Sequence, residues 1–147
     1  MVVNELFELK ELSVGLVLTD GVRFLGVRPT GQTFYDMPKG MQNQGETLKD
    51  TVIREVKEET GFDISKYRSA LSDQGRFKYR ITKDLHVFLL MLPQLPPTSS
   101  MRCTSTFEMY GRKIPEVNGY KYFDWDDLSM FIPKMQSILK EVHRSLE

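Results

Sequence analysis

Apolar residues recur along most of the chain in short runs of the length of a β-strand. Two valine-rich runs near the start are joined through Asp20-Gly21, a pair that favours a two-residue hairpin turn. The polar residues 82–84 separate two later runs in the same way. These patterns predict strands over residues 13–20, 22–29, 75–81, 85–92, 105–110 and 120–125.

Two longer segments have the 3.6-residue spacing of amphipathic helices. The first begins after Thr47, which precedes residues 48–50 in a loose capping-box pattern, and it ends at Gly61. The second covers residues 133–146. Its apolar face consists of Met135, Ile138, Leu139, Val142 and Leu146.

The segments between these elements are predicted to be loops and one short helix. Glycine, proline and polar residues mark residues 31–46 as a loop. Asp126 or Asp127 is expected to cap a short helix before Pro133. The order of strands, helix, strands and terminal helix indicates an α/β fold in which helices pack on a mixed sheet.

The composition limits the kinds of partner. A chain of 147 residues is expected to form a single domain, residues 1–147. Its 20 basic and 20 acidic residues cancel, so no overall field attracts nucleic acid or an anionic membrane. No segment has the roughly 18 apolar residues that a membrane helix needs, and no signal peptide is evident. The single Cys103 fits a reducing compartment, so the expected location is cytoplasmic.

Residues 54–61, REVKEETG, place three glutamates on adjacent turns of the first helix. On a helical wheel with Glu55 at zero, Glu59 lies at about 40°, inside the apolar stripe, and Glu58 lies at about −60°, on its flank. An unpaired carboxylate that points into the protein is costly, and a divalent cation would remove that cost. Carboxylates at i, i+3 and i+4 offer the oxygen ligands that Mg²⁺ and Mn²⁺ prefer.

An ordinary solvated helix face is the alternative to a metal site. Arg54 with Glu58, or Asp50 with Arg54, can form surface ion pairs at i, i+4, and such pairs are frequent on helices. The three glutamates alone therefore leave both interpretations open, and the spacing around them has to distinguish the two.

That spacing resembles the Nudix box, which reads G, five residues, E, seven residues, R-E-aliphatic-x-E-E-x-G-apolar. Every defined position is filled between Gly40 and Phe62, including Glu46 and residues 54–61. The chain thus resembles the Nudix hydrolases, the MutT-like family. The resemblance implies the α/β/α sandwich of that family, with a mixed β-sheet between helices, over nearly the whole chain.

Nudix enzymes hydrolyse a diphosphate bond linked to a nucleoside or similar group, with Mg²⁺ or Mn²⁺ as cofactor. The resemblance implies that Glu55, Glu58 and Glu59 bind the metal. It also implies that the backbone carbonyl of Lys39 is a further ligand and that Arg54 orients a glutamate. Glu55 or another carboxylate would then lie near the attacking water.

Members of this family often add one acidic residue from a distant loop as metal ligand or general base. Glu116 is the first candidate, because an acid shortly before a G-aromatic-x-aromatic strand occurs there in polyphosphate-cleaving members. Glu108 is the second candidate. For either residue the alternative is a solvated loop acid. Glu46 is expected to hold the loop against the helix.

The residues at the start of the box indicate a substrate class. Members that cleave dinucleoside polyphosphates or the 5′ triphosphate of RNA commonly carry Pro-Lys-Gly, as in residues 38–40 here, whereas members that sanitise oxidised nucleoside triphosphates commonly carry two glycines. Lys39 can meet additional phosphates as a point charge. A solvent-facing loop lysine is the alternative.

Residues 75–81 offer further candidates for substrate contacts. Tyr79 lies close to where the dinucleoside polyphosphate enzymes carry a tyrosine. Alternation places Arg76 and Lys78 on one face, which can receive phosphates or an RNA backbone. The opposite, aromatic face can equally be core, an interpretation that fits Phe77 better than Tyr79.

Five other aromatic or histidine side chains complete the candidates. Phe34 and Tyr35 can stack on a base, or they can pack under the loop. His86 is expected to be a satisfied core or edge histidine, and His143 is expected on the polar side of the terminal helix. Trp125 is expected to anchor the terminal region.

The expected function is metal-dependent hydrolysis of a phosphoanhydride bond in a dinucleoside polyphosphate, a nucleoside triphosphate or RNA with a 5′ triphosphate. A nucleotide-sugar or ADP-ribose pyrophosphatase is one alternative. A sensor with the Nudix fold that binds a nucleotide without cleaving it is another, although such proteins usually lack a box glutamate. The resemblance also allows a homodimer, and no membrane partner is expected.

Overall fold

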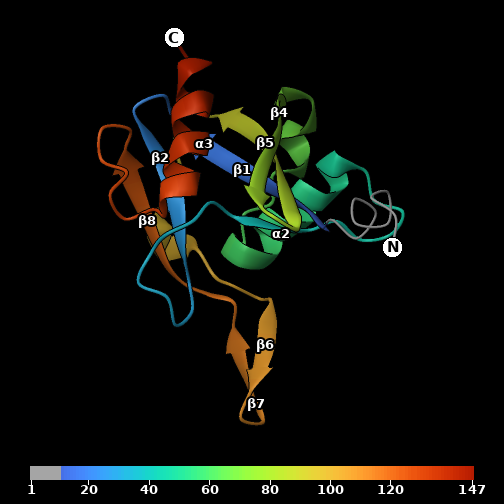
Figure 1. Cartoon of the computed structure of the whole chain (residues 1–147). Helices are drawn as coiled ribbons and strands as arrows, with labels where there is room; N and C mark the ends of the chain where they lie inside the picture. Colours follow the sequence, from blue (N-terminus) through green and yellow to red (C-terminus); the bar gives the residue numbers. More distant parts are fainter. Residues whose placement is uncertain (1–10) are drawn as a thin grey trace.

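The computed structural model describes residues 11–147 (Figure 1). Its strands are β1 (Glu11–Thr19), β2 (Arg23–Pro29), β3 (Lys39–Met41), β4 (Ser72–Arg80), β5 (Lys83–Met91), β6 (Thr106–Met109), β7 (Arg112–Pro115) and β8 (Val117–Asp124). Its helices are α2 (Leu48–Thr60) and α3 (Pro133–Arg144), with two 3₁₀ segments, η1 (Ser65–Ala70) and η2 (Thr98–Ser100). No helix within residues 11–147 is long and apolar enough to cross a membrane.

A mixed sheet in the order β4-β5-β1-β2-β8 forms the centre of the molecule. β1 and β5 run parallel along their whole length, and the other neighbouring pairs are antiparallel. β2 pairs with β1 only where Thr19 faces Phe24, while β3 pairs with β1 at residues 13–15. The short strand β3 therefore lies where β2 diverges from β1.

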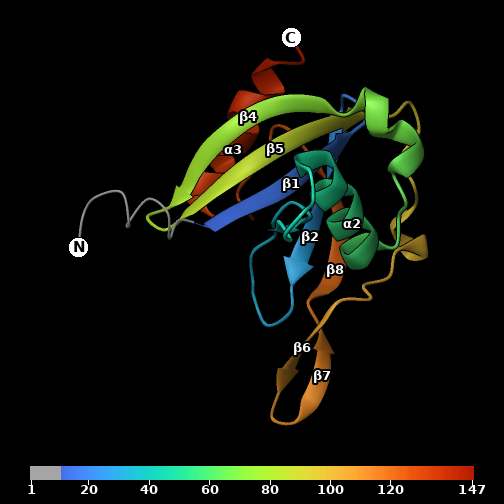
Figure 2. The ribbon, with the colours of Figure 1, turned by 90° about the vertical axis from the view of Figure 1, so that its right-hand side faces the viewer.

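Side chains alternate along each central strand, so apolar residues point to both faces of the sheet, and a helix covers each face. Val14, Leu16 and Leu18 of β1 pack in the cluster that contains Val52 and Val56 of α2. Side chains on the opposite face of the sheet pack against α3, which lies across that face in Figures 1 and 2. These include Val17, Leu85, Val87, Met135, Ile138 and Leu139. The predicted three-layer α/β/α arrangement is confirmed.

The ends of α2 are fixed by the residues that the sequence indicates. Thr47 Oγ1 accepts a hydrogen bond from the Asp50 N–H at 3.1 Å, and Asp50 accepts one from the Thr47 N–H at 3.0 Å. Gly61 ends the helix with φ of 78°, a left-handed conformation that glycine adopts without strain. Asp50 also pairs with Arg68 at 2.8 Å, so its partner is not the residue four positions along the helix.

Three local predictions differ from the structure. The predicted loop 31–46 contains β3, and β7 was not predicted; strands of three or four residues are defined by their pairing and carry little periodicity of their own. The short helix before Pro133 is absent, since Asp127 instead caps a turn by accepting hydrogen bonds from the backbone and the hydroxyl of Ser129.

β6 and β7 form a separate two-stranded hairpin that projects from the body of the protein (Figures 1 and 2). Tyr110 and Gly111 make its tip, and both have positive φ. The base of the hairpin is closed by a hydrogen bond from the Glu116 N–H to the Ser105 carbonyl at 3.0 Å. Glu116 thus lies at the junction between the hairpin and β8.

The capping box generates a prediction about stability. Replacing Thr47 by Ala removes the side-chain acceptor for the Asp50 N–H and is expected to lower the free energy of unfolding by about 1 kcal/mol. The matched variant Thr47→Ser keeps a hydroxyl and should lose less than half of that. Urea denaturation measures both values, and equal losses for the two variants would show that the hydroxyl does not stabilise the helix.

Candidate functional site

α2 places two buried carboxylates against β3. Glu55 and Glu59 are each only 7% exposed, which confirms that Glu59 lies in the apolar stripe of the helix. Glu59 Oε1 accepts a hydrogen bond from the Lys39 N–H at 3.1 Å. A Cβ at Gly40 would lie 2.0 Å from the carboxyl carbon of Glu55, so only glycine at this position allows the carboxylate to approach the backbone so closely.

Arg54 connects the loop before α2 with the glutamates of the helix. Its Nε and Nη2 donate to the two carboxylate oxygens of Glu46 at 2.7 and 3.0 Å, and Nη2 also donates to the Met41 carbonyl at 2.9 Å. The hydrogen bonds from Arg54 lower the pKa of Glu46 to about 2. Nη1 lies 2.6 Å from Glu55 Oε1 and 3.3 Å from Glu58 Oε2.

The buried carboxylates are electrostatically unfavourable as they stand. Burial raises the pKa of Glu59 to about 8, although the hydrogen bond and charge of Lys39 oppose this shift. Burial also raises the pKa of Glu55, against the ion pair with Arg54. Repulsion from Glu116 adds to both shifts, which indicates that this acid belongs to the same cluster of negative charge.

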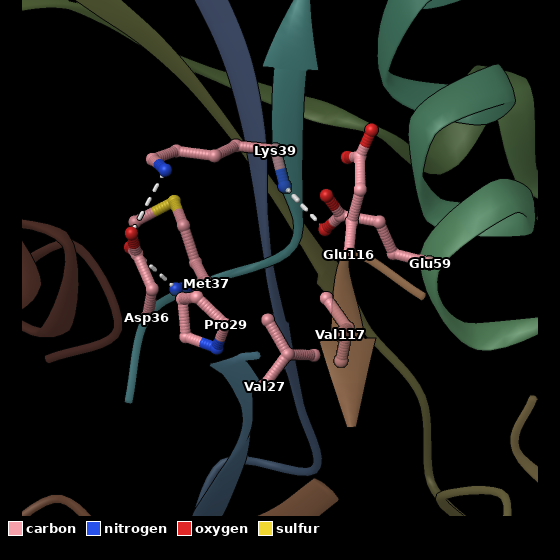
Figure 3. A pocket seen from close by; sticks show the side chains of 8 residues that line it. All are labelled: Val27, Pro29, Asp36, Met37, Lys39, Glu59, Glu116 and Val117. Carbon is pink, nitrogen blue, oxygen red and sulfur yellow. Dashed lines mark hydrogen bonds and ion pairs between the residues drawn. The ribbon is translucent and has the colours of Figure 1, made fainter. Parts of the chain in front are cut away.

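Two cavities meet at the carboxylates. One of about 200 Å³ has Glu59 and Glu116 on one side and Asp36 and Met37 on the other, with Lys39 extending from the first side to the second (Figure 3). The other, of about 350 Å³, is lined by Glu55, Lys83, Lys39 and Glu116. Lys39 and Glu116 line both cavities, whereas the second candidate, Glu108, is exposed on β6 and lines neither.

The side chain of Lys39 points away from the glutamates, toward Asp36. Its Nζ lies 2.8 Å from Asp36 Oδ2, and Tyr79 Oη donates to the same oxygen at 3.5 Å. Burial of the ammonium lowers the pKa of Lys39, but attraction to Asp36 and Tyr79 outweighs burial, so the pKa is raised overall. Sequence reasoning missed Asp36, whose only signal is its i, i+3 spacing to Lys39.

The remaining candidates on β4 are divided between core and surface. Tyr79 is 7% exposed and reaches the site through Asp36, whereas Phe77 is only half-buried. The expectation that Phe77 fits the core better than Tyr79 is therefore wrong. Arg76 and Lys78 are exposed on β4 and line neither of the two cavities.

Aromatic packing accounts for several other candidates. Tyr35 packs edge-on against Phe123, with 5.0 Å between ring centroids, a geometry that favours packing under the loop; Phe34 is half-buried. His86 is buried with Nε2 2.7 Å from Asp73 Oδ1, as expected for a core histidine, but its buried Nδ1 has no hydrogen-bond partner within residues 11–147, so the ring is only half satisfied. His143 and Trp125 stack with ring centroids 4.4 Å apart. His143 is thus not simply on the polar side of α3: it covers the indole.

The donor set suits a hard divalent cation, although the carboxylates do not converge on a common point. Within residues 11–147, no group of three or more His, Cys, Asp and Glu side chains is arranged to hold a metal ion. Arg54 holds Glu55 and Glu58 by ion pairs. The buried, mutually repelling carboxylates and the cradle at Gly40 nevertheless fit a cation with oxygen ligands.

The raised pKa of Glu59 predicts an unusual pH dependence of stability. Between about pH 4.5 and pH 8 the folded protein holds a proton that the unfolded chain has lost, so stability should fall as pH rises through this window. One such group contributes a slope of up to about 1.4 kcal/mol per pH unit. Glu59→Gln should reduce this slope in urea denaturation with a chelator present.

The matched control for that measurement is Glu58→Gln, because the Glu58 side chain is 36% exposed and belongs to the same helix. Its pH profile should follow that of the unsubstituted protein. Parallel profiles for the protein and the Glu59→Gln variant would contradict the assignment of the buried proton to Glu59.

Comparisons with known proteins agree with this geometry. Residues 9–146 match the NUDIX domain family model. An uncharacterised 17.7 kDa protein in the e-segB intergenic region of Enterobacteria phage T4 is 36% identical over 125 residues, which cover 77% of this chain and 82% of the phage protein. An RNA pyrophosphohydrolase of Marinomonas sp. (strain MWYL1) is 24% identical over 151 residues, which cover 92% of this chain and 94% of that protein.

A solved structure shares the fold. The bifunctional NMN adenylyltransferase/ADP ribose pyrophosphatase of Francisella tularensis, complexed with AMP and Mn ion, has a TM-score of 0.73 at 15% identity and covers 98% of this chain. The chain spans about half of that protein, 47% of its length. The family model, by contrast, extends over nearly the whole chain, including α2, α3 and the central sheet. This protein therefore belongs to the Nudix family.

Proposed function

We propose that this protein is a divalent-metal-dependent pyrophosphohydrolase that cleaves a phosphoanhydride bond in a nucleoside polyphosphate. The observation that carries the proposal is the position of Glu55, Glu59 and Glu116. All three line cavities that open beside β3. Glu55 and Glu59 are also buried, and burial raises their pKa values even though Arg54 and Lys39 are close by.

The residues of the site can be assigned to complementary roles. Mg²⁺ or Mn²⁺, when bound, would supply the positive charge that neutralises phosphate oxygens, with Glu55, Glu58, Glu59, Glu116 and the Lys39 carbonyl as candidate ligands. Arg54 already contacts Glu55 and Glu58 and can orient them. A carboxylate oxygen of Glu55 or Glu116 is the candidate acceptor for the proton of the attacking water.

Pro38-Lys39-Gly40 supports substrates with three or more phosphates, because Lys39 lines both cavities and its ammonium, paired with Asp36, is a positive charge on the far side of the first cavity from Glu59 and Glu116. The similarity to an RNA pyrophosphohydrolase supports the same choice. Dinucleoside polyphosphates, nucleoside triphosphates and 5′-triphosphorylated RNA are therefore the substrates to test first. ADP-ribose and nucleotide-sugars are the second candidate class, since the Francisella protein of the same fold includes an ADP ribose pyrophosphatase.

A sensor that binds a nucleotide without cleaving it is the alternative to an enzyme. Every glutamate of the box is present, so the sequence lacks the loss that usually accompanies such a role. The network of Arg54 with Glu46, Glu55 and Glu58 is likewise intact. Both observations favour turnover.

The proposal predicts hydrolysis in a substrate panel with Mg²⁺ and, separately, Mn²⁺. The panel comprises diadenosine polyphosphates, nucleoside triphosphates, a short 5′-triphosphate RNA, ADP-ribose and a UDP-sugar. Substrates with three or more phosphates should turn over fastest, and product analysis by ion-exchange chromatography measures the rates. A chelator should abolish turnover, since the reacting oxygens would lose the compensating charge.

The control is the double variant Glu58→Gln/Glu59→Gln, which should lose activity by about three orders of magnitude or more if these carboxylates hold the cofactor. Cleavage of ADP-ribose or UDP-sugars alone would shift the assignment to the second class. Tight nucleotide binding in calorimetry, with no turnover of any substrate, would establish the sensor instead.

A further inference from the structure

Lys39 belongs to the carboxylate cluster by its backbone but not by its side chain. Its N–H donates to Glu59 Oε1 at 3.1 Å, while its ammonium lies 2.8 Å from Asp36 Oδ2, on the opposite side of the cavity (Figure 3). One residue thus connects the two walls of the cavity, and the direction of its side chain decides which wall carries the positive charge.

Asp36 is built into the protein as a fixed acceptor. It is 4% exposed, and its backbone exchanges two hydrogen bonds with Val27, each at 2.8 Å. Its Oδ1 accepts a hydrogen bond from the Met37 N–H at 2.8 Å, which leaves Oδ2 for the Lys39 ammonium and the Tyr79 hydroxyl. The carboxylate therefore cannot rotate away without breaking these contacts.

Without this acceptor, the nearest negative charges for Lys39 would be the glutamates. Glu59 and Glu116 line the same cavity as Lys39, and the backbone of Lys39 already contacts Glu59. A lysine side chain is flexible and carries a compact charge, so a released ammonium would seek the buried, poorly compensated carboxylates. An ammonium placed there would compete with a divalent cation for the same oxygens.

We propose that Asp36 is a positioning residue that holds the Lys39 ammonium away from Glu59 and Glu116 and so keeps these carboxylates available to a divalent cation. The inference rests on the proposed function, because it assumes that the carboxylates bind metal. Asp36 acts through Lys39 and makes no contact with the cation. The hydroxyl of Tyr79, a core residue, donates to the same Asp36 oxygen as the ammonium and so supports this arrangement.

The test is Mn²⁺ binding by calorimetry, in the absence of any nucleotide, to the full chain and four variants: Asp36→Asn, Lys39→Met, the double variant Asp36→Asn/Lys39→Met and Asp63→Asn. Asp36→Asn should weaken Mn²⁺ binding about tenfold, because the released ammonium competes with the ion. The double variant should bind Mn²⁺ as Lys39→Met does, because it contains no ammonium to release.

Asp63→Asn is the matched control, since Asp63 is the exposed partner of Lys57, at 4.0 Å, and should leave Mn²⁺ affinity unchanged. Unchanged affinity in Asp36→Asn would overturn the inference, and so would an equal loss in the double variant, because the effect would then not pass through Lys39. If Asp36→Asn does not fold, as judged by circular dichroism, Asp36→Ser with and without Lys39→Met provides the same comparison.

The outcomes separate this inference from the proposed function. Mn²⁺ binding and hydrolysis by the unsubstituted protein, together with unchanged Mn²⁺ affinity in Asp36→Asn, would retain the function and reject the positioning role. Absence of Mn²⁺ binding by the unsubstituted protein would reject both. A tenfold loss that Lys39→Met suppresses would support both.

Discussion

The site depends on the hydrogen bonds and ion pairs of the Arg54 guanidinium. Its hydrogen bonds to both carboxylate oxygens of Glu46, together with one to the Met41 carbonyl, fix the loop between β3 and α2 against the helix. The planar fork of an arginine suits this bidentate contact, which a lysine could not reproduce. The remaining nitrogen faces Glu55 and Glu58, so the group that fixes the loop also sets the direction of the acids.

Much of the fold could be predicted from the sequence because local signals agreed with tertiary packing. Thr47 and Gly61 mark the ends of α2 through contacts with neighbours a few residues away, and the alternation on β1 and β5 reflects burial on two faces. β3 could not be predicted in this way. Its three residues form a strand because they pair with β1 at the point where β2 diverges.

The candidate site shows the same division. The fixed spacing of the box indicated Glu55 and Glu59, whose buried positions follow from helix geometry alone. Asp36 carries no comparable pattern, since its burial depends on pairing with Val27 and on the side chain of a lysine three residues later. Likewise, alternation places Phe77 and Tyr79 on one face but does not show which of them is buried and which is only half-buried.

Along β3, the glutamates of α2 and the ammonium of Lys39 contact different groups. Charges that belong to the helix meet the backbone of the strand at Lys39 and Gly40, whereas the ammonium of the strand meets an acid outside the helix. The carboxylates consequently keep their mutual repulsion, which an ion pair with Lys39 would relieve. This repulsion destabilises the folded protein when no cation is bound. A bound cation offsets it, so the same arrangement of carboxylates favours cation binding.

The hairpin of β6 and β7 shapes the outside of the molecule independently of the carboxylate site. Its strands pair only with each other, and the hydrogen bond between Glu116 and Ser105 closes its base. Residues added or removed around Tyr110 would therefore alter how far the molecule extends into solvent while leaving Glu116 beside the sheet. The length of this extension is thus independent of the arrangement of the acids.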